Sequence, residues 1–263
     1  MTIDQTARAQ FRLDTNCPLE DEERLCVLIQ ERKDLDGARV YEGMSSFFRA
    51  ILYKGDSYIM ADPVILPWVR ERYGYQKPEW FCKFENLREL DHKLSEYGYE
   101  IADTHIYLLP DEKAEDFEFE TVPYEEEWFD PERIASFQEE NPFPHALVYS
   151  RTQPDVIALA LKDGDKYIAM AGASVDGKYL WQIGIDVLPE YGSHGLAVYL
   201  VTTLKQEILR RGFLPFYGTS ESHALSMDVG IRSGFLPAWS EVFVRKAGDG
   251  RACMPGEGPG PSG

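Results

Sequence analysis

The fold is constrained most by a predicted strand, turn and helix that follow one another between residues 179 and 211. Residues 179–187 are mostly apolar and predict a strand, and the turn after them contains Gly192 and Gly195. The segment 195–211 repeats apolar residues four apart on one helical face, at Leu196, Leu200, Leu204 and Ile208. Such a helix must bury this face against a sheet. We therefore expect a layered fold of strands and helices.

Local signals predict the order of the other elements. In the first part of the chain we expect a β-hairpin over 48–53 and 58–61, helices over 63–73 and 79–97, and a strand over 106–109. In the second part we expect strands over 117–122, 156–161, 167–171, 179–187, 214–218 and 239–244, with helices over 132–137, 195–211 and 223–233. The expected fold class is α+β, with a mixed, mostly antiparallel sheet flanked by helices and preceded by a smaller α+β domain.

The length of 263 residues is sufficient for two domains with separate cores. We place the boundary near residue 114, where a short strand ends and an acidic stretch begins. Residues 1–114 then form an N-terminal α+β domain without an assigned role, and residues 115–246 form the second domain. Residues 247–263 are rich in Gly and Pro and are expected to be a disordered tail.

The net charge of −18 argues against nucleic-acid and membrane partners, because both are bound through clustered Lys and Arg. Much of this charge is local, since residues 115–140 contain eleven acidic residues and one basic residue, Arg133. A solvated face is the ordinary interpretation of such a segment. A negative cleft that attracts a cationic amine is the functional alternative.

The four cysteines, Cys17, Cys26, Cys82 and Cys253, show no spacing typical of metal sites and are expected to be reduced thiols. The N-terminus lacks the basic and apolar segments of a signal peptide, and no apolar stretch is long enough to span a bilayer. We therefore expect a cytoplasmic protein without a metal.

The turn after residue 187 is the segment in which we expect a ligand to bind. A strand that ends in a turn and delivers a helix N-terminus presents unpaired backbone N–H groups and the positive end of the helix dipole, which suit phosphate oxygens. The chain contains neither a Gly-x-x-x-x-Gly-Lys-Ser/Thr nor a Gly-x-Gly-x-x-Gly motif, so a P-loop and a dinucleotide-binding fingerprint are unsupported.

Residues 187–197, Val-Leu-Pro-Glu-Tyr-Gly-Ser-His-Gly-Leu-Ala, resemble the signature (Gln/Arg)-x-x-Gly-x-(Gly/Ala) of the GNAT acyltransferase superfamily. Residues 223–235, His-Ala-Leu-Ser-Met-Asp-Val-Gly-Ile-Arg-Ser-Gly-Phe, are similar to its second signature. Within the superfamily, residues 184–187 look most like the branch of zwittermicin-type resistance acetyltransferases. The resemblance covers roughly residues 115–246 and implies acetyl-CoA as the acyl donor.

The resemblance also implies roles for individual residues. It gives the backbone N–H of Val187 as the oxyanion donor and pairs the strand at Ile185, Asp186 and Val187 with the pantetheine arm. The residues implied to bind acetyl-CoA are Ile185, Val187, Gly192, Ser193, His194, Gly195, Leu196, Ala197 and Ser226.

Three positions depart from the family pattern: Gly192 replaces Arg or Gln, His223 replaces Asn, and Gly230 replaces a Tyr that protonates the thiolate in many relatives. Asp186 is the first candidate for the general base, because burial at the strand end would raise its pKa. A water chain that ends at the acidic segment is the alternative. Ser226 and His223 are the candidates for contact with the thiolate.

The resemblance thus implies an N-acetyltransferase that transfers an acetyl group from acetyl-CoA to a primary amine of a small molecule. The acidic composition favours a cationic acceptor. A non-catalytic acyl-CoA-binding regulatory or interaction module is the alternative, suggested by the missing Arg or Gln at position 192 and the missing Tyr at position 230. The N-terminal domain could also be a degenerate copy of the same fold, and a homodimer is left open.

Overall fold

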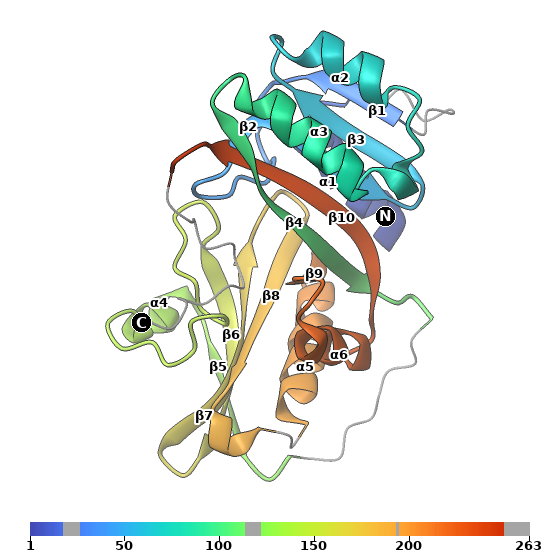
Figure 1. Cartoon of the computed structure of the whole chain (residues 1–263). Coiled ribbons are helices and arrows are strands. Elements are labelled where there is room, and N and C mark those ends of the chain that lie inside the picture. The colour runs from blue at the N-terminus through green and yellow to red at the C-terminus, as the bar shows by residue number, and fades with distance from the viewer. Residues whose placement is uncertain (18–26, 114–121, 193–194, 250–263) are drawn as a thin grey trace. The chain divides into compact units, whose positions relative to one another are not determined.

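The computed structural model describes residues 1–17, 27–113, 122–192 and 195–249 (Figure 1). These residues form ten strands and six α-helices, which confirms the α+β class. The strands pair mostly antiparallel, with parallel pairing between β1 (Val27–Glu31) and β3 (Asp56–Ala61) and between β8 (Leu180–Val187) and β9 (Leu214–Thr219). None of the helices in this part of the chain combines the length and the apolar composition needed to cross a bilayer.

The chain divides into two compact units. The first unit contains Met1–Tyr107 and the segment that starts at Ala238, and the second contains Leu108–Pro237. The domain boundary near residue 114 stays a prediction. The predicted domains place the last strand, β10 (Phe235–Lys246), in the second domain. In the structure, most of β10 belongs to the first compact unit.

The first unit has the strand order β1, β3, β2, β10, β4, where β2 is Ser45–Tyr53 and β4 is Tyr99–Pro110. Its helices are α1 (Ile3–Asp14), α2 (Leu66–Tyr73) and α3 (Phe84–Ser95). The predicted hairpin is confirmed, but its turn consists of two residues, Lys54 and Gly55, both with positive φ. This is the turn geometry that matches the twist of paired strands.

Three further elements of the first unit differ from expectation, one of which is the unpredicted strand β1. The helix predicted over 79–97 begins only at Phe84, because Pro78–Trp80 forms a separate 3₁₀ turn. Helix α1 was not predicted, although Thr2 and Gln5 form a capping box at its start.

The second unit has the strand order β9, β8, β7, β6, β5, where β7 is Lys166–Val175, β6 is Asp155–Asp163 and β5 is Glu125–Phe129. Its helices are α4 (Pro131–Ile134), α5 (Leu196–Arg210) and α6 (Ala224–Arg232). The strand predicted over 117–122 falls almost entirely outside the described residues, as does most of the predicted tail. The remaining predicted elements of this unit are confirmed with shifted ends.

Two apolar layers cover the sheet of the second unit. One layer joins Leu200 and Leu204 of α5 to Ile183 and Trp181 of β8. Figure 1 shows α5 beside this sheet. The other joins Phe143, Leu147 and Ile134 to Ala158 and Met170 of β6 and β7. Because side chains alternate along a strand, Gln182, Gly184 and Asp186 of β8 face the second layer.

Strands β8 and β9 separate before β8 ends. Their parallel register runs from Leu180 opposite Leu214 to Ile183 opposite Tyr217. The pairing of β8 with β7 continues four residues further, to Val187 opposite Ala169. Within the described residues, the last part of β8 therefore has a ladder on one side and an open backbone edge on the other.

Candidate active site

The turn that leads from β8 into α5 is built around two glycines. Pro189–Tyr191 form a 3₁₀ turn, and Gly192 follows it. Gly195 is the N-cap of α5 with φ of 75°, a conformation that residues with a Cβ rarely adopt. An added Cβ at Gly195 would meet no other atom within 4 Å. The predicted residues Ser193 and His194 lie outside the described part of the chain.

Among the described residues, the N-terminus of α5 has no side-chain cap from its N-cap residue, Gly195. The N-cap makes no side-chain hydrogen bond, and the first turn contains no acidic residue. The N–H of Tyr199 donates to the carbonyl of Gly195 at 3.0 Å as the first bond of the helix ladder. The N–H groups of Leu196 and Ala197 precede that bond, so the positive end of a 15-residue helix points out of the turn.

The open edge of β8 carries the predicted residues Ile185 and Val187. Their side chains are partly buried against the layer formed with α5, at the same end as the turn. Their backbones are therefore held in place by packing on one face and by the ladder with β7 on one side. A second extended chain can pair with such an edge.

Asp186 points to the opposite face, where it holds a loop. Its carboxylate accepts hydrogen bonds from the backbone N–H groups of His145, at 2.7 Å, and Ala146, at 2.9 Å. The Nδ1 atom of His145 lies 2.5 Å from the other carboxylate oxygen. The side chain of Asp186 is 16% exposed and that of His145 is 40% exposed. The structure thus brings a histidine, which the sequence analysis did not identify, to a predicted site residue.

The Asp186 carboxylate changes the acid–base behaviour of His145. The hydrogen bond from the imidazole to Asp186 raises the pKa of His145 above its ordinary value of 6.5, and partial burial opposes this effect. A proton on Nδ1, directed at Asp186, leaves Nε2 as the nitrogen that can accept a proton. A base oriented by a buried carboxylate is a recurrent arrangement in active sites.

The loop that carries His145 is fixed by close packing and by polar side chains. A Cβ at Gly184 would lie 1.8 Å from the carbonyl oxygen of His145, and one at Gly172 would lie 2.0 Å from that of Ala146. These two glycines are cross-strand partners in β7 and β8, so the loop rests directly on the sheet backbone.

Two polar side chains anchor the ends of this loop. Asn141 bonds the N–H of Phe143 and the carbonyl of Leu147, and Asp155 accepts the N–H of Tyr149 at 2.8 Å. The position of His145 is therefore determined before any substrate arrives.

On the other face, Ser226 of α6 meets Tyr217 of β9. Their hydroxyl oxygens are 2.9 Å apart. Burial raises the pKa of Tyr217, the bond with Ser226 lowers it, and the negative charge of Asp186 raises it. A Cβ at Gly230 would lie 3.1 Å from the ring of Tyr217, so this ring lies directly beside α6 at that position.

The remaining predicted residue, His223, is the N-cap of α6 and is exposed. Its side chain makes no capping hydrogen bond. The structure therefore pairs Ser226 with Tyr217 and Asp186 with His145. Over the described ranges, no group of three or more His, Cys, Asp or Glu residues is arranged to hold a metal ion.

Comparison with known proteins gives a family for this region. Residues 114–228 match the model of the acetyltransferase (GNAT) family. This match concerns the family as a whole and does not support the narrower likeness to zwittermicin-type resistance enzymes. No curated protein matches the chain.

Solved structures with similar folds include a protein described as an acetyltransferase from the GNAT family of Novosphingobium aromaticivorans, at 17% identity, a TM-score of 0.40 and coverage of 57% of this chain and 68% of that one. A GCN5-related N-acetyltransferase from Kribbella flavida has 14% identity, a TM-score of 0.42 and coverage of 60% and 64%. A GCN5-related N-acetyltransferase-like protein from Streptococcus suis has 12% identity, a TM-score of 0.46 and coverage of 92% and 100%. The chain thus spans about two thirds of the first two structures, and at these scores no argument about this protein depends on the likeness.

The family match ends at Asp228 and so includes β8, the glycine turn and all of α5, together with His145, Asp186, Tyr217 and Ser226. Residues 114–228, less than half of the chain, are therefore similar to the GNAT family of acetyltransferases.

Proposed function

We propose that the second unit transfers an acetyl group from acetyl-CoA to a primary amine of a small molecule, with His145 as the general base. The observation that carries this proposal is the His145–Asp186 pair, which is anchored to the same segment of β8 that offers an open backbone edge. The strand that orients the proposed proton acceptor thus also carries the edge that would bind the acyl donor.

The donor is bound mainly by backbone groups in this proposal. The pantetheine arm contains amides and would pair with the open edge of β8 at Ile185 and Val187. The pyrophosphate would bind at the N-terminus of α5, beside the N–H groups of Leu196 and Ala197, where the N-cap Gly195 supplies no side chain. This mode of binding tolerates Gly192, because it needs no side chain at that position.

The proposed reaction assigns each proton to a group. The amine nitrogen attacks the thioester carbonyl, and its proton moves to Nε2 of His145. The N–H of Val187 stabilises the oxyanion that develops on the carbonyl oxygen. The carbon–sulfur bond then breaks, and the departing sulfur receives a proton from the Tyr217–Ser226 pair.

These roles modify the expectation for Asp186. Its carboxylate accepts three hydrogen bonds from one loop, so it is better suited to orient His145 than to take a proton itself. We therefore propose that Asp186 is a positioning residue and that His145 replaces it as the base. The exposed His223 has no role in this scheme.

We further propose that the acceptor is a cation. Glu139 and Glu140 are exposed and precede the loop that carries His145, so an ammonium group would be attracted to that loop. Only part of the acidic segment is available for this purpose, because Glu126 accepts a hydrogen bond from Tyr199 and Glu127 from Tyr167. A cytosolic location would supply the acetyl-CoA.

The test combines binding with turnover on the full chain. Calorimetry with acetyl-CoA measures donor binding, and a thiol reagent measures CoA release in the presence of spermidine, an aminoglycoside and neutral primary amines. The proposal predicts binding, amine-dependent thiol release, and faster release with the cationic amines at low salt. Binding without release for any amine would instead support a non-catalytic acyl-CoA-binding module.

A further inference from the structure

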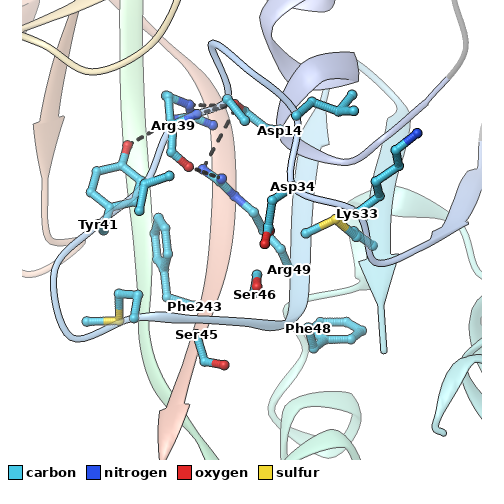
Figure 2. A pocket seen from close by; sticks show the side chains of 15 residues that line it. Asp14, Lys33, Asp34, Arg39, Tyr41, Ser45, Ser46, Phe48, Arg49 and Phe243 are labelled. Carbon is cyan, nitrogen blue, oxygen red and sulfur yellow. Dashed lines mark hydrogen bonds and ion pairs between the residues drawn. The ribbon is translucent and has the colours of Figure 1, made fainter. Parts of the chain in front are cut away.

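Carboxylates inside the fold have different partners in the two units. In the first unit, the buried Asp14 is paired with the guanidinium group of Arg39, whose Nε lies 2.6 Å from the carboxylate (Figure 2). In the second unit, Asp155 and Asp186 instead accept hydrogen bonds from backbone N–H groups of one loop. A carboxylate that binds backbone N–H groups fixes the path of the chain itself, because each backbone donor in the interior needs a partner.

The loop consists of residues 141–149, which contain neither a helix nor a strand. Its backbone donors therefore depend on partners outside a regular ladder. Near the middle of the loop, Asp186 of β8 accepts the N–H groups of His145 and Ala146. The same carboxylate also binds Nδ1 of His145, so the imidazole is correctly placed only while this part of the loop stays on β8.

Asp155 holds the C-terminal end of the loop in the same way. It is the first residue of β6, and its carboxylate accepts the N–H of Tyr149 at 2.8 Å. The N–H of Val148 donates to the same carboxylate. Burial raises the pKa of Asp155, and these two hydrogen bonds lower it. The two bonds therefore offset part of the cost of placing this charge inside the fold.

Tyr149 has a backbone conformation that a tyrosine rarely adopts. Its φ is 55°, in the left-handed region, where the Cβ lies too close to the backbone. Its hydroxyl donates to the carbonyl of Ile134 at 2.9 Å, and its ring packs against the apolar layer that contains Phe143. A residue keeps such a conformation only where its surroundings hold it, and the bonds to Asp155 and Ile134 supply that restraint.

We infer that Asp155 is a positioning residue for His145. By binding the N–H of Tyr149, it keeps the chain in the left-handed turn four residues after His145 and so keeps the imidazole on Asp186. Without this carboxylate, two N–H groups lose their partner and Tyr149 can relax to a negative φ, which changes the direction of the chain. The effect on the reaction rate rests on the proposed function, whereas the effect on the imidazole can be measured in the free protein.

The first test uses Asp155→Asn in the full chain, with Asp165→Asn in the exposed turn between β6 and β7 as the matched control. The amide lacks the charge and one of the two acceptor oxygens. Histidine NMR titration should then give a pKa of His145 closer to 6.5, because the imidazole is held less firmly on Asp186. The kcat for thiol release should fall at least about tenfold, while the Kd for acetyl-CoA stays the same. A carboxylate with a purely structural role would lower only the Tm.

A second test separates the conformation of Tyr149 from its ring. In the Asp155→Asn background, Tyr149→Gly and Tyr149→Ala both remove the ring, but only glycine adopts a φ of 55° without steric cost. The variant with Tyr149→Gly is expected to exceed the one with Tyr149→Ala in kcat by about fivefold or more, the ratio that follows from the penalty of a Cβ in the left-handed region. Its His145 pKa should also lie further above 6.5.

The outcomes distinguish the positioning role of Asp155 from the proposed function. A wild-type His145 pKa in Asp155→Asn overturns the positioning role, as do equal His145 pKa values for the glycine and alanine variants. If the wild type releases no thiol with any amine, the proposed function fails, and the pKa of His145 in the free protein still decides the role of Asp155. Should Asp155→Asn not fold, Tyr149→Gly and Tyr149→Ala with Asp155 intact decide instead, with the higher His145 pKa expected for glycine.

Discussion

Asp186 shows how the contacts of one residue determine its chemical role. Its two oxygens are occupied by two backbone N–H groups and one imidazole nitrogen, all from consecutive residues of one loop. The carboxylate thereby fixes the loop, the ring orientation and the tautomer of His145 together. A substitution that removes the charge of Asp186 but keeps its shape should change the pKa of His145 more than it changes the fold.

We predict that Asp186→Asn lowers the pKa of His145 towards its ordinary value, because the hydrogen bond to the carboxylate is the main cause that raises it. Histidine NMR titration measures this pKa directly. The lower limb of the pH–rate profile should move to lower pH with it.

The same substitution has a pH-dependent effect on stability. A raised pKa in the folded state stabilises the protein fully below the unfolded pKa, and this contribution is lost as pH rises through the folded pKa. The stability difference between the wild type and Asp186→Asn, from urea denaturation, should therefore be larger at pH 5.5 than at pH 9. An unchanged His145 pKa in the variant contradicts the assignment.

Tyr217→Phe tests the proposed proton donor. Removal of the hydroxyl should reduce the rate of thiol release by a factor of about 10² or more, as is usual for a general acid, while the affinity for acetyl-CoA stays the same. Tyr75→Phe, at an exposed tyrosine of the first unit, is the matched control. A wild-type rate in Tyr217→Phe would exclude the hydroxyl as the donor.

At the scale of elements, helix α5 is the part that the sequence predicts best. Its apolar repeat and the two glycines of its turn are local signals, and Gly195 adopts the conformation for which glycine is suited. The hairpin at Lys54 and Gly55 is equally local. The position of His145 is not, because it depends on contacts with Asp186, 41 residues further along the chain, and on close packing over Gly184. No periodicity or motif encodes such packing, so the proposed base could not be found from the sequence alone.

Ala197→Asp separates two effects of the α5 N-terminus. A carboxylate in the first turn should stabilise the helix by about 0.3–1 kcal/mol through the helix dipole. It should also repel the pyrophosphate, since like charges 4 Å apart interact with about 4 kcal/mol at an effective dielectric constant of 20. We therefore expect a higher Tm and at least a tenfold higher Kd for acetyl-CoA. Turnover of acetyl-pantetheine, which has no pyrophosphate, should not change, and an equal loss with both donors would contradict this binding mode.

At the scale of the whole molecule, the sequence predicts two parts but not how the last strand is shared between them. Residues 239–244 of β10 pair with β2, at Trp239 opposite Tyr53 and Val242 opposite Ala50. The apolar pattern of this segment indicates a strand but does not name its partner, which lies almost 200 residues earlier. Partner choice is a property of the assembled sheet.

This pairing predicts the behaviour of a fragment. Residues 115–246 expressed alone would contain β10 without β2, so an apolar strand edge would be exposed. We expect such a fragment to aggregate or to unfold at a lower temperature than the full chain, by size-exclusion chromatography and circular dichroism. A monomeric fragment with the Tm of the full chain would show instead that the predicted domain folds independently.

The most direct test of the account is the rate of thiol release from acetyl-CoA, with a cationic amine as acceptor, by the wild type and by His145→Gln. The account predicts a decrease of about 10²–10⁴ in kcat, the range for loss of a general base, with an unchanged Kd for acetyl-CoA by calorimetry. His92→Gln on the exposed surface of α3 should behave as the wild type. A His145→Gln protein that turns over at the wild-type rate would contradict the central claim.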